Sequence, residues 1–85
     1  GGEEFSVLLP ECRLEEAKTV AERLREKVAG HVTPFDGEKI RCTISVGIGE
    51  SDPENLHEDL DGLMRKTDKA LYGAKKSGRN CIHYF

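Results

Sequence analysis

The sequence lacks any apolar run long enough to cross a membrane, and it lacks an excess of basic residues. Its 85 residues are 36% hydrophobic and 34% charged, and no stretch approaches the roughly 20 apolar residues of a spanning helix. The net charge of −3 argues against duplex nucleic acid as a partner, since phosphate backbones are bound by basic surfaces. The length excludes more than one domain. A small soluble domain is the class that remains.

Cysteines are too few and too scattered for a disulfide framework or a zinc site. Cys12, Cys42 and Cys81 are odd in number and far apart, which matches neither arrangement. Reduced thiols in a cytoplasmic protein are the expectation. No linker, repeat or low-complexity tract divides the chain.

The first half of the chain predicts a strand followed by a helix. Phe5–Leu9 is an apolar run that ends at Pro10, as a buried strand would. Residues 13–29 predict an amphipathic helix, because apolar residues recur at three- and four-residue spacing. Gly30 is the expected C-terminal stop. The predicted inner face of this helix consists of Leu14, Ala17, Val20 or Ala21, Leu24 and Val28.

Residues 31–38 carry the turn signals Thr33-Pro34 and Asp36-Gly37, and a strand is predicted after them. Apolar residues alternate with others from Ile40 to Ile48, the period of a half-buried strand. Gly47 and Gly49 lie on its other face, where they allow a ligand or a second backbone to come close. A bulge or strand exit is the alternative for these two glycines.

The last third predicts a helix and a short strand. The helix runs from about residue 58 to 77 and ends at Gly78, and Cys81–Phe85 is the strand. The order strand, helix, strand, helix, strand predicts an α/β fold, more closely an α+β sandwich with helices packed on a partial sheet. The expected inner face of the second helix comprises Leu60, Leu63, Thr67, Ala70, Leu71 and Ala74.

The residues with the clearest chemical potential open the chain, Gly1-Gly2-Glu3-Glu4-Phe5. Glycines permit a tight turn and close approach to a ligand. Carboxylates at the mouth of a strand suit a divalent cation or proton transfer. The alternative is that Glu3 and Glu4 are solvated turn residues.

Lys75 and Arg79 form a second candidate site at the end of the second helix. On the pattern alone, the favoured interpretation is charge that complements the helix C-terminus. The alternative is a clamp for a polyphosphate, in which arginine binds two oxygens at once.

Three segments in order resemble the GGDEF family of diguanylate cyclases, and together they span nearly the whole chain. The first is Gly1-Gly2-Glu3-Glu4-Phe5, which resembles the signature hairpin of the family. The second is Ile44–Ile48, similar to its later core strand. The third is Thr67–Lys75 with Ser77–Asn80, similar to its last helix and turn.

The resemblance implies a β-α-β-α-β portion of a nucleotidyl-cyclase-like, ferredoxin-like GGDEF domain. It implies condensation of two GTP molecules into cyclic di-GMP with release of two pyrophosphates, using Mg²⁺ or Mn²⁺. Each subunit of an antiparallel homodimer would hold one GTP, whose 3′-hydroxyl attacks the α-phosphate of the other.

The resemblance also implies roles for single residues. Glu3 would bind metal and act as the base near the 3′-hydroxyl, and Glu4 would be a supporting acid or a ligand of a second metal. Gly1 and Gly2 would let the backbone approach the phosphates. Lys75 and Arg79 would hold the phosphate tail, and Arg23 would belong to an inhibitory site for cyclic di-GMP.

Against that family pattern, residues 1–85 correspond to the C-terminal half of one domain. The strand with a metal-binding Asp, the guanine-reading residues and the Arg-x-x-Asp inhibitory motif belong to the other half. The 85 residues alone are therefore expected to be inactive or nearly so. One alternative is a non-catalytic module that binds GTP or cyclic di-GMP and regulates a neighbour. Another is a structural dimerisation unit without a ligand.

Overall fold

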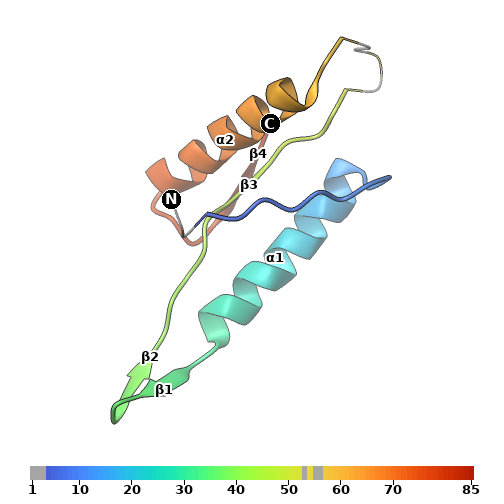
Figure 1. The fold of residues 1–85 in the computed structure, drawn as a ribbon. Coiled ribbons are helices and arrows are strands. Elements are labelled where there is room, and N and C mark those ends of the chain that lie inside the picture. Colours follow the sequence, from blue (N-terminus) through green and yellow to red (C-terminus); the bar gives the residue numbers. More distant parts are fainter. Residues whose placement is uncertain (1–3, 53, 55–56) are drawn as a thin grey trace.

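The computed structural model describes residues 4–52, 54 and 57–85, and in them the chain forms two helices and two small sheets (Figure 1). Helix α1 is Leu14–Gly30 and helix α2 is Leu60–Lys76. Strands β1 (Thr33–Phe35) and β2 (Glu38–Ile40) make an antiparallel hairpin. Strands β3 (Val46–Ile48) and β4 (Ile82–Tyr84) make a parallel pair. The predicted α+β class, with helices on a partial sheet, is confirmed.

Helix α1 lies within one residue of its predicted span, but its ends differ from expectation. Its first amide, Leu14 N–H, donates to Glu50 Oε2 at 2.9 Å, so a residue from a distant loop caps the helix. At the other end Gly30 is still helical, and His31 leaves with an extended backbone at φ −83°. The predicted glycine stop at Gly30 is wrong, because a chain that exits directly into extended backbone needs no left-handed residue.

The predicted turn at Asp36-Gly37 is confirmed as the tip of the β1–β2 hairpin. Both residues have positive φ, 52° and 81°, as the two central residues of a type I′ turn require. The sequence predicted no strand at Thr33–Phe35, whereas the structure pairs Thr33 with Ile40. The hairpin projects away from both helices in Figure 1.

The predicted strand from Ile40 to Ile48 is two short strands, β2 and β3, and the residues between them do not pair with any of the described strands. An alternating pattern predicts which face of a sheet a side chain lies on, but a strand also needs a neighbouring strand to form hydrogen bonds with. In the structured ranges, β2 pairs only with β1 and β3 only with β4. Residues 41–45 therefore lie outside both ladders.

Strands β3 and β4 join through α2 into a parallel β-α-β unit, with Val46 opposite Ile82 and Ile48 opposite Tyr84. The predicted terminal strand is thereby confirmed. Both helices contact both strands of this pair. It follows that β3 and β4 form the middle layer of the fold (Figure 1).

A glycine on β3 and another directly after it let α2 approach the sheet closely. A Cβ on Gly47 would lie 2.2 Å from the backbone nitrogen of Leu71, and one on Gly49 would lie 2.4 Å from Thr67 Oγ1. Of the alternatives open for these glycines, the structure shows close approach of a second backbone at both. Gly49 also lies at the strand exit, because β3 ends at Ile48. Ala70 and Ala74, at 4% and 0% exposure, complete this contact.

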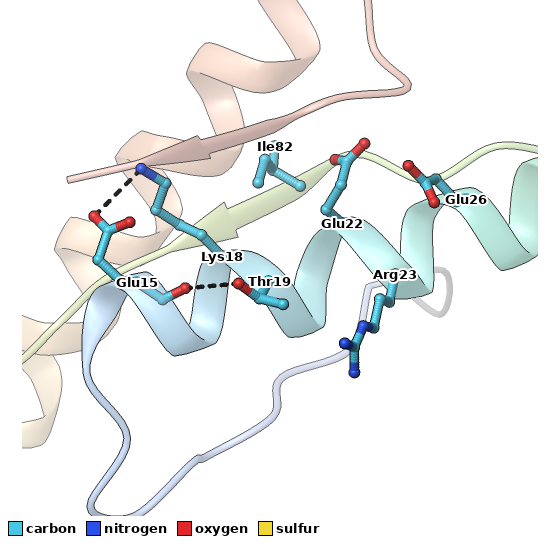
Figure 2. A pocket seen from close by; sticks show the side chains of 7 residues that line it. All are labelled: Glu15, Lys18, Thr19, Glu22, Arg23, Glu26 and Ile82. Atoms are coloured by element: carbon cyan, nitrogen blue, oxygen red, sulfur yellow. Dashed lines mark hydrogen bonds and ion pairs between the residues drawn. The ribbon is translucent and has the colours of Figure 1, made fainter.

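The opposite face of the strands meets α1. Ile82 points toward this helix (Figure 2), and Lys18 Nζ lies 4.1 Å from the centre of the Tyr84 ring. Ala21, at 7% exposure, is the inner residue, whereas Val20 and Leu24 are each half exposed. The predicted inner face was therefore right for Ala21 and wrong for Leu24.

Phe5–Leu9, predicted as a buried strand, is neither a strand nor buried. Phe5 is 89% exposed and Val7 is 78% exposed. The segment meets no partner strand in the part of the chain that the structure describes, and a strand alone cannot bury its side chains in a sheet. No helix among the described residues has the length and apolar character to cross a membrane.

Candidate functional site

The end of α2 carries two of the predicted site residues and has a well-defined stop. Gly78 has φ +109°, and its amide donates to the carbonyl of Lys75 at 3.4 Å. The next amide, of Arg79, donates to the carbonyl of Ala74 at 3.1 Å. These two bonds are the Schellman motif. The predicted stop at Gly78 is confirmed, and Arg79 lies directly beyond the helix.

Lys75 meets Glu4 across a gap of 71 residues in sequence. Lys75 Nζ lies 3.4 Å from Glu4 Oε2, and both side chains keep part of their surface in solvent. An exposed pair of this kind adds little to stability. Its significance is positional, because it brings an acid of the opening motif to the lysine of the closing helix.

A hollow of about 220 Å³ lies beside this ion pair. Its lining residues come from the N-terminal segment and from one face of α2: Glu4, Asp68, Leu71, Tyr72 and Lys75. In such a pair, each group can give up its partner for a ligand that carries the same charge as that partner. The ammonium can bind a phosphate, and the carboxylate can bind a cation.

The sequence pattern gave no chemical role to Asp68 or Tyr72, two of the residues that line this hollow. Tyr72 is 64% exposed, and Lys76 Nζ lies 5.5 Å from the centre of its ring. Both residues share a face with Lys75, since positions 68, 72 and 75 are one and two helical turns apart. This spacing is the feature of the sequence from which a place for Asp68 and Tyr72 beside Lys75 could have been predicted.

The structure brings together only some of the predicted site residues. Gly1, Gly2 and Glu3 lie outside the described residues. Glu4 and Lys75 are in contact. Arg79 follows the end of α2, four residues after Lys75, and does not line the hollow. In the described ranges no three His, Cys, Asp or Glu side chains gather as a metal site.

Arg23 lies on α1, at the border of a second hollow of about 510 Å³. The hollow is lined by Glu15, Lys18, Thr19, Glu22, Arg23, Glu26 and Ile82 (Figure 2). Glu22 and Glu26 point toward the strands, whereas Arg23 points away from Ile82 (Figure 2). The carboxylates make this hollow poorly suited to an anion, and an inhibitory role for Arg23 stays a prediction.

Glu22 and Arg25 form the tightest ion pair on α1. Arg25 Nε donates to both Glu22 carboxylate oxygens, at 3.0 and 3.1 Å, and its Nη2 also donates to Oε1. The hydrogen bond from Arg25 holds the pKa of the Glu22 carboxyl below its ordinary value, and the same bond raises the pKa of Arg25. Both groups therefore stay charged around neutral pH.

Comparison with known proteins gives matches that cover nearly the whole chain. The family model described as diguanylate cyclase, GGDEF domain, matches residues 1–81. Diguanylate cyclase A of Treponema denticola is 40% identical over 82 residues, which cover 96% of this chain and 22% of the relative. Response regulator PleD of Caulobacter vibrioides is 37% identical over 86 residues, covering 96% and 18%. Diguanylate cyclase DgcM of Escherichia coli is 40% identical over 82 residues, covering 96% and 18%. The chain spans about a fifth of the length of these curated relatives.

Proposed function

The chain belongs to the GGDEF family of diguanylate cyclase domains, and on that premise we propose that it serves the condensation of two GTP molecules into cyclic di-GMP and two pyrophosphates. The observation that carries the proposal is the contact of Glu4 with Lys75 beside the hollow on α2. Two motifs at opposite ends of the chain thus meet at one place, as the parts of a shared nucleotide site must.

The phosphate tail of GTP is the part of the substrate assigned to Lys75 and Arg79. Lysine acts as a compact point charge, and arginine adds a planar fork that binds two phosphate oxygens. Cations are needed there, because the C-terminal end of a helix has a negative partial charge and repels phosphate by itself. In phosphoryl transfer, positioning and charge neutralisation are most of what a protein contributes.

Glu3 and Glu4 are the proposed ligands of Mg²⁺ or Mn²⁺, with Glu3 also as the base for the attacking 3′-hydroxyl. Carboxylate oxygens are the donors that such hard cations prefer, and Mg²⁺ is commonly held by one or two carboxylates together with substrate phosphates. Glu4, the described member of the pair, fits because its carboxylate is exposed at the hollow. The cation when bound supplies neutralisation of the phosphate charge.

Three further parts of the proposal concern the oligomeric state, the location and the activity of the 85 residues alone. A homodimer is proposed, since each subunit holds one GTP and the two nucleotides must meet. A cytoplasmic location is proposed as well, since GTP is the substrate. The 85 residues alone are proposed to be inactive or nearly so. The support for their inactivity is a thin core, in which Ala21, Ala70 and Ala74 are the buried apolar residues of the described ranges, and small two-stranded sheets are marginal without further packing.

The test is product formation by the full-length natural protein that contains this chain. Incubation with GTP and Mg²⁺, followed by chromatography, is expected to give cyclic di-GMP and pyrophosphate in a ratio of one to two. Glu3→Gln removes the proposed base and metal ligand, and Lys75→Ala removes a cation from the phosphate tail, so each should reduce kcat/KM at least about a hundredfold. Chelation of the divalent cation should stop the reaction.

Two other results would refute the cyclase. Binding of GTP or cyclic di-GMP without turnover would identify a regulatory module instead. Absence of binding to either nucleotide would point to a structural unit. The isolated 85-residue chain provides the remaining comparison, and a normal rate from that chain would contradict its proposed inactivity.

A further inference from the structure

The turn that follows α2 is held in an unusual backbone conformation. Arg79 and Asn80 are consecutive non-glycine residues with positive φ, 65° and 48°. Such residues are uncommon, although asparagine adopts this region more readily than most. Conformations of this kind persist where surrounding contacts determine them. Two sets of contacts hold this turn, one from its own helix and one from α1.

One anchor of the turn is the carbonyl of Ala74, a fully buried residue of α2. It accepts from the amide of Arg79 at 3.1 Å and from Cys81 Sγ at 3.3 Å. Both bonds tie the turn to its own helix. They fix the backbone on either side of Asn80 and leave the Asn80 side chain available for a second anchor.

The second anchor comes from the other helix. Arg25 Nη1 on α1 donates to Asn80 Oδ1 at 3.0 Å, although the two residues are 55 apart in sequence. Arg25 is itself held by Glu22, which receives its Nε at 3.0 and 3.1 Å. The Arg25 side chain keeps only 19% of its surface exposed. A guanidinium held on one side by a carboxylate is a rigid donor for the asparagine on the other.

We infer that Glu22, Arg25 and Asn80 form a positioning clasp, which holds the turn so that Arg79 presents its guanidinium to the phosphate tail of GTP. This inference rests on the proposed function and extends it to residues that do not contact the nucleotide. Two hydrogen bonds fix the backbone around Arg79. Its own amide donates to the carbonyl of Ala74, and the side chain of the next residue, Asn80, accepts from Arg25. Without the clasp, the backbone is expected to leave the left-handed region, and the direction of the Arg79 side chain would change with it.

The experiment uses the full-length natural protein and the substitution Asn80→Gly. Glycine tolerates positive φ, so the substitution removes the hydrogen-bond acceptor without forcing a new backbone conformation. The KM for GTP is expected to rise about five- to tenfold, the size of a loosened charged contact, while kcat changes less than about twofold. Asn80→Asp keeps the acceptor and should restore the wild-type KM. Lys27→Ala, at an exposed position of α1, should leave KM unchanged.

Inorganic triphosphate separates positioning of Arg79 from a general effect on the fold. It has phosphates but no base, so its inhibition constant should rise by the same factor as KM in Asn80→Gly. In an Arg79→Ala background, Asn80→Gly should have no further effect on that constant, because a residue that acts through Arg79 is not additive with its removal. Thermal unfolding of each variant shows whether the fold is retained.

The possible results separate the clasp from the cyclase activity on which it rests. A wild-type protein that makes no cyclic di-GMP overturns the proposed function and, with it, this inference. A wild-type protein that makes cyclic di-GMP, together with an unchanged KM in Asn80→Gly, overturns the clasp alone. The clasp is also overturned if Asn80→Gly weakens triphosphate binding equally with and without Arg79, or if the variant differs from wild type only in thermal stability.

Discussion

Helices α1 and α2 have equal lengths of 17 residues and pack on the same two strands, yet they are held in different ways. Helix α2 is defined by its own neighbourhood: Asp59 caps its start by accepting from the amide of Gly62 at 2.8 Å, and a Schellman motif closes its end. Helix α1 has no side-chain cap from Arg13. It depends on Glu50 and Asn80, which come from distant parts of the chain.

The two helices also differ in how closely they pack on the strands. Helix α2 buries Ala70 and Ala74 and lies so close to β3 that a Cβ on Gly47 would meet the backbone of Leu71. Helix α1 contributes a single buried residue, Ala21, and leaves Val20 and Leu24 half exposed. Substitutions on α2 should therefore be costly and predictable, whereas those on α1 should be mild unless they break a long-range contact.

The largest effect is expected from Gly47→Val, in the contact between β3 and α2. The new Cβ would lie 2.2 Å from the backbone nitrogen of Leu71, and a helix backbone cannot move aside as a flexible side chain can. A loss of about 3 kcal/mol in the free energy of unfolding is expected, measured by thermal unfolding of the full-length protein.

The matched control is Gly30→Ala on α1, where a Cβ meets nothing within 4 Å. Alanine there should be neutral or stabilise by about 0.5–1 kcal/mol. If Gly47→Val and Gly30→Ala unfolded at the same temperature, the tight contact of α2 would not be what holds this side of the fold together.

A smaller effect is expected from Gly78→Ala at the end of α2. The φ of +109° at this position is unfavourable for any residue with a Cβ, so a cost of about 1–2 kcal/mol is expected. Gly78→Asn should cost less, because asparagine is the usual substitute for glycine at this helix position. Thermal unfolding distinguishes the two, and an equal loss in both variants would speak against the Schellman motif as the cause.

Removal of the local cap of α2 should follow in size. Asp59→Ala leaves the amide of Gly62 without its acceptor and should cost about 1 kcal/mol, while Asp59→Asn retains the acceptor and should cost little. Arg13→Ala, at the corresponding position of α1, should have no such effect because its side chain makes no cap. Amide exchange in the first turn of each helix measures this, and equal protection losses for Asp59→Ala and Arg13→Ala would contradict it.

The smallest effect concerns pH. The hydrogen bond from Arg25 lowers the pKa of Glu22 on α1, and the hydrogen bond from Lys66 lowers the pKa of Glu58 ahead of α2. A carboxyl whose pKa is lower in the folded state stabilises the fold above its unfolded pKa, and that contribution is lost as pH falls through the folded pKa. Stability should therefore decline slightly below about pH 4, the ordinary Glu range.

NMR titration of the two carboxyl groups tests this prediction. Glu22→Gln and Glu58→Gln should each remove part of the decline, and each pKa should return to the ordinary range when Arg25 or Lys66 is replaced by methionine. Salt should weaken the effect only in part, because the side chains of both pairs are partly covered, with Arg25 19% and Glu58 9% exposed. A decline of the same size in the double Gln variant would show that other carboxyls are responsible.

The sequence predicted what local periodicity determines and missed what depends on a partner. Both helices follow from three- and four-residue spacing, and the stop at Gly78 follows from the conformational freedom of glycine. Phe5–Leu9 failed because an apolar run becomes a buried strand only beside another strand. Gly47 was left open between a bulge and close approach, since nothing local identifies the backbone that α2 brings against it.

The candidate site divides along the same line. No spacing rule brings Glu4 to Lys75 over 71 residues, and only the resemblance to the GGDEF family placed them in one site. The positions of Asp68 and Tyr72 beside Lys75 could have been predicted from helical spacing. The contact between Arg25 and Asn80 could not, because it joins two elements whose relative placement the sequence alone does not determine.

The β1–β2 hairpin offers an attachment point for a reporter. Every residue of its two strands and its Asp36-Gly37 tip is exposed, and in the described part of the chain these strands touch each other but no further helix or strand. Exposed tips of this kind tolerate inserted sequence. A fluorescent or affinity tag placed between Asp36 and Gly37 would therefore follow the protein in cells or in an assembly while leaving the Glu4–Lys75 contact and both helices untouched.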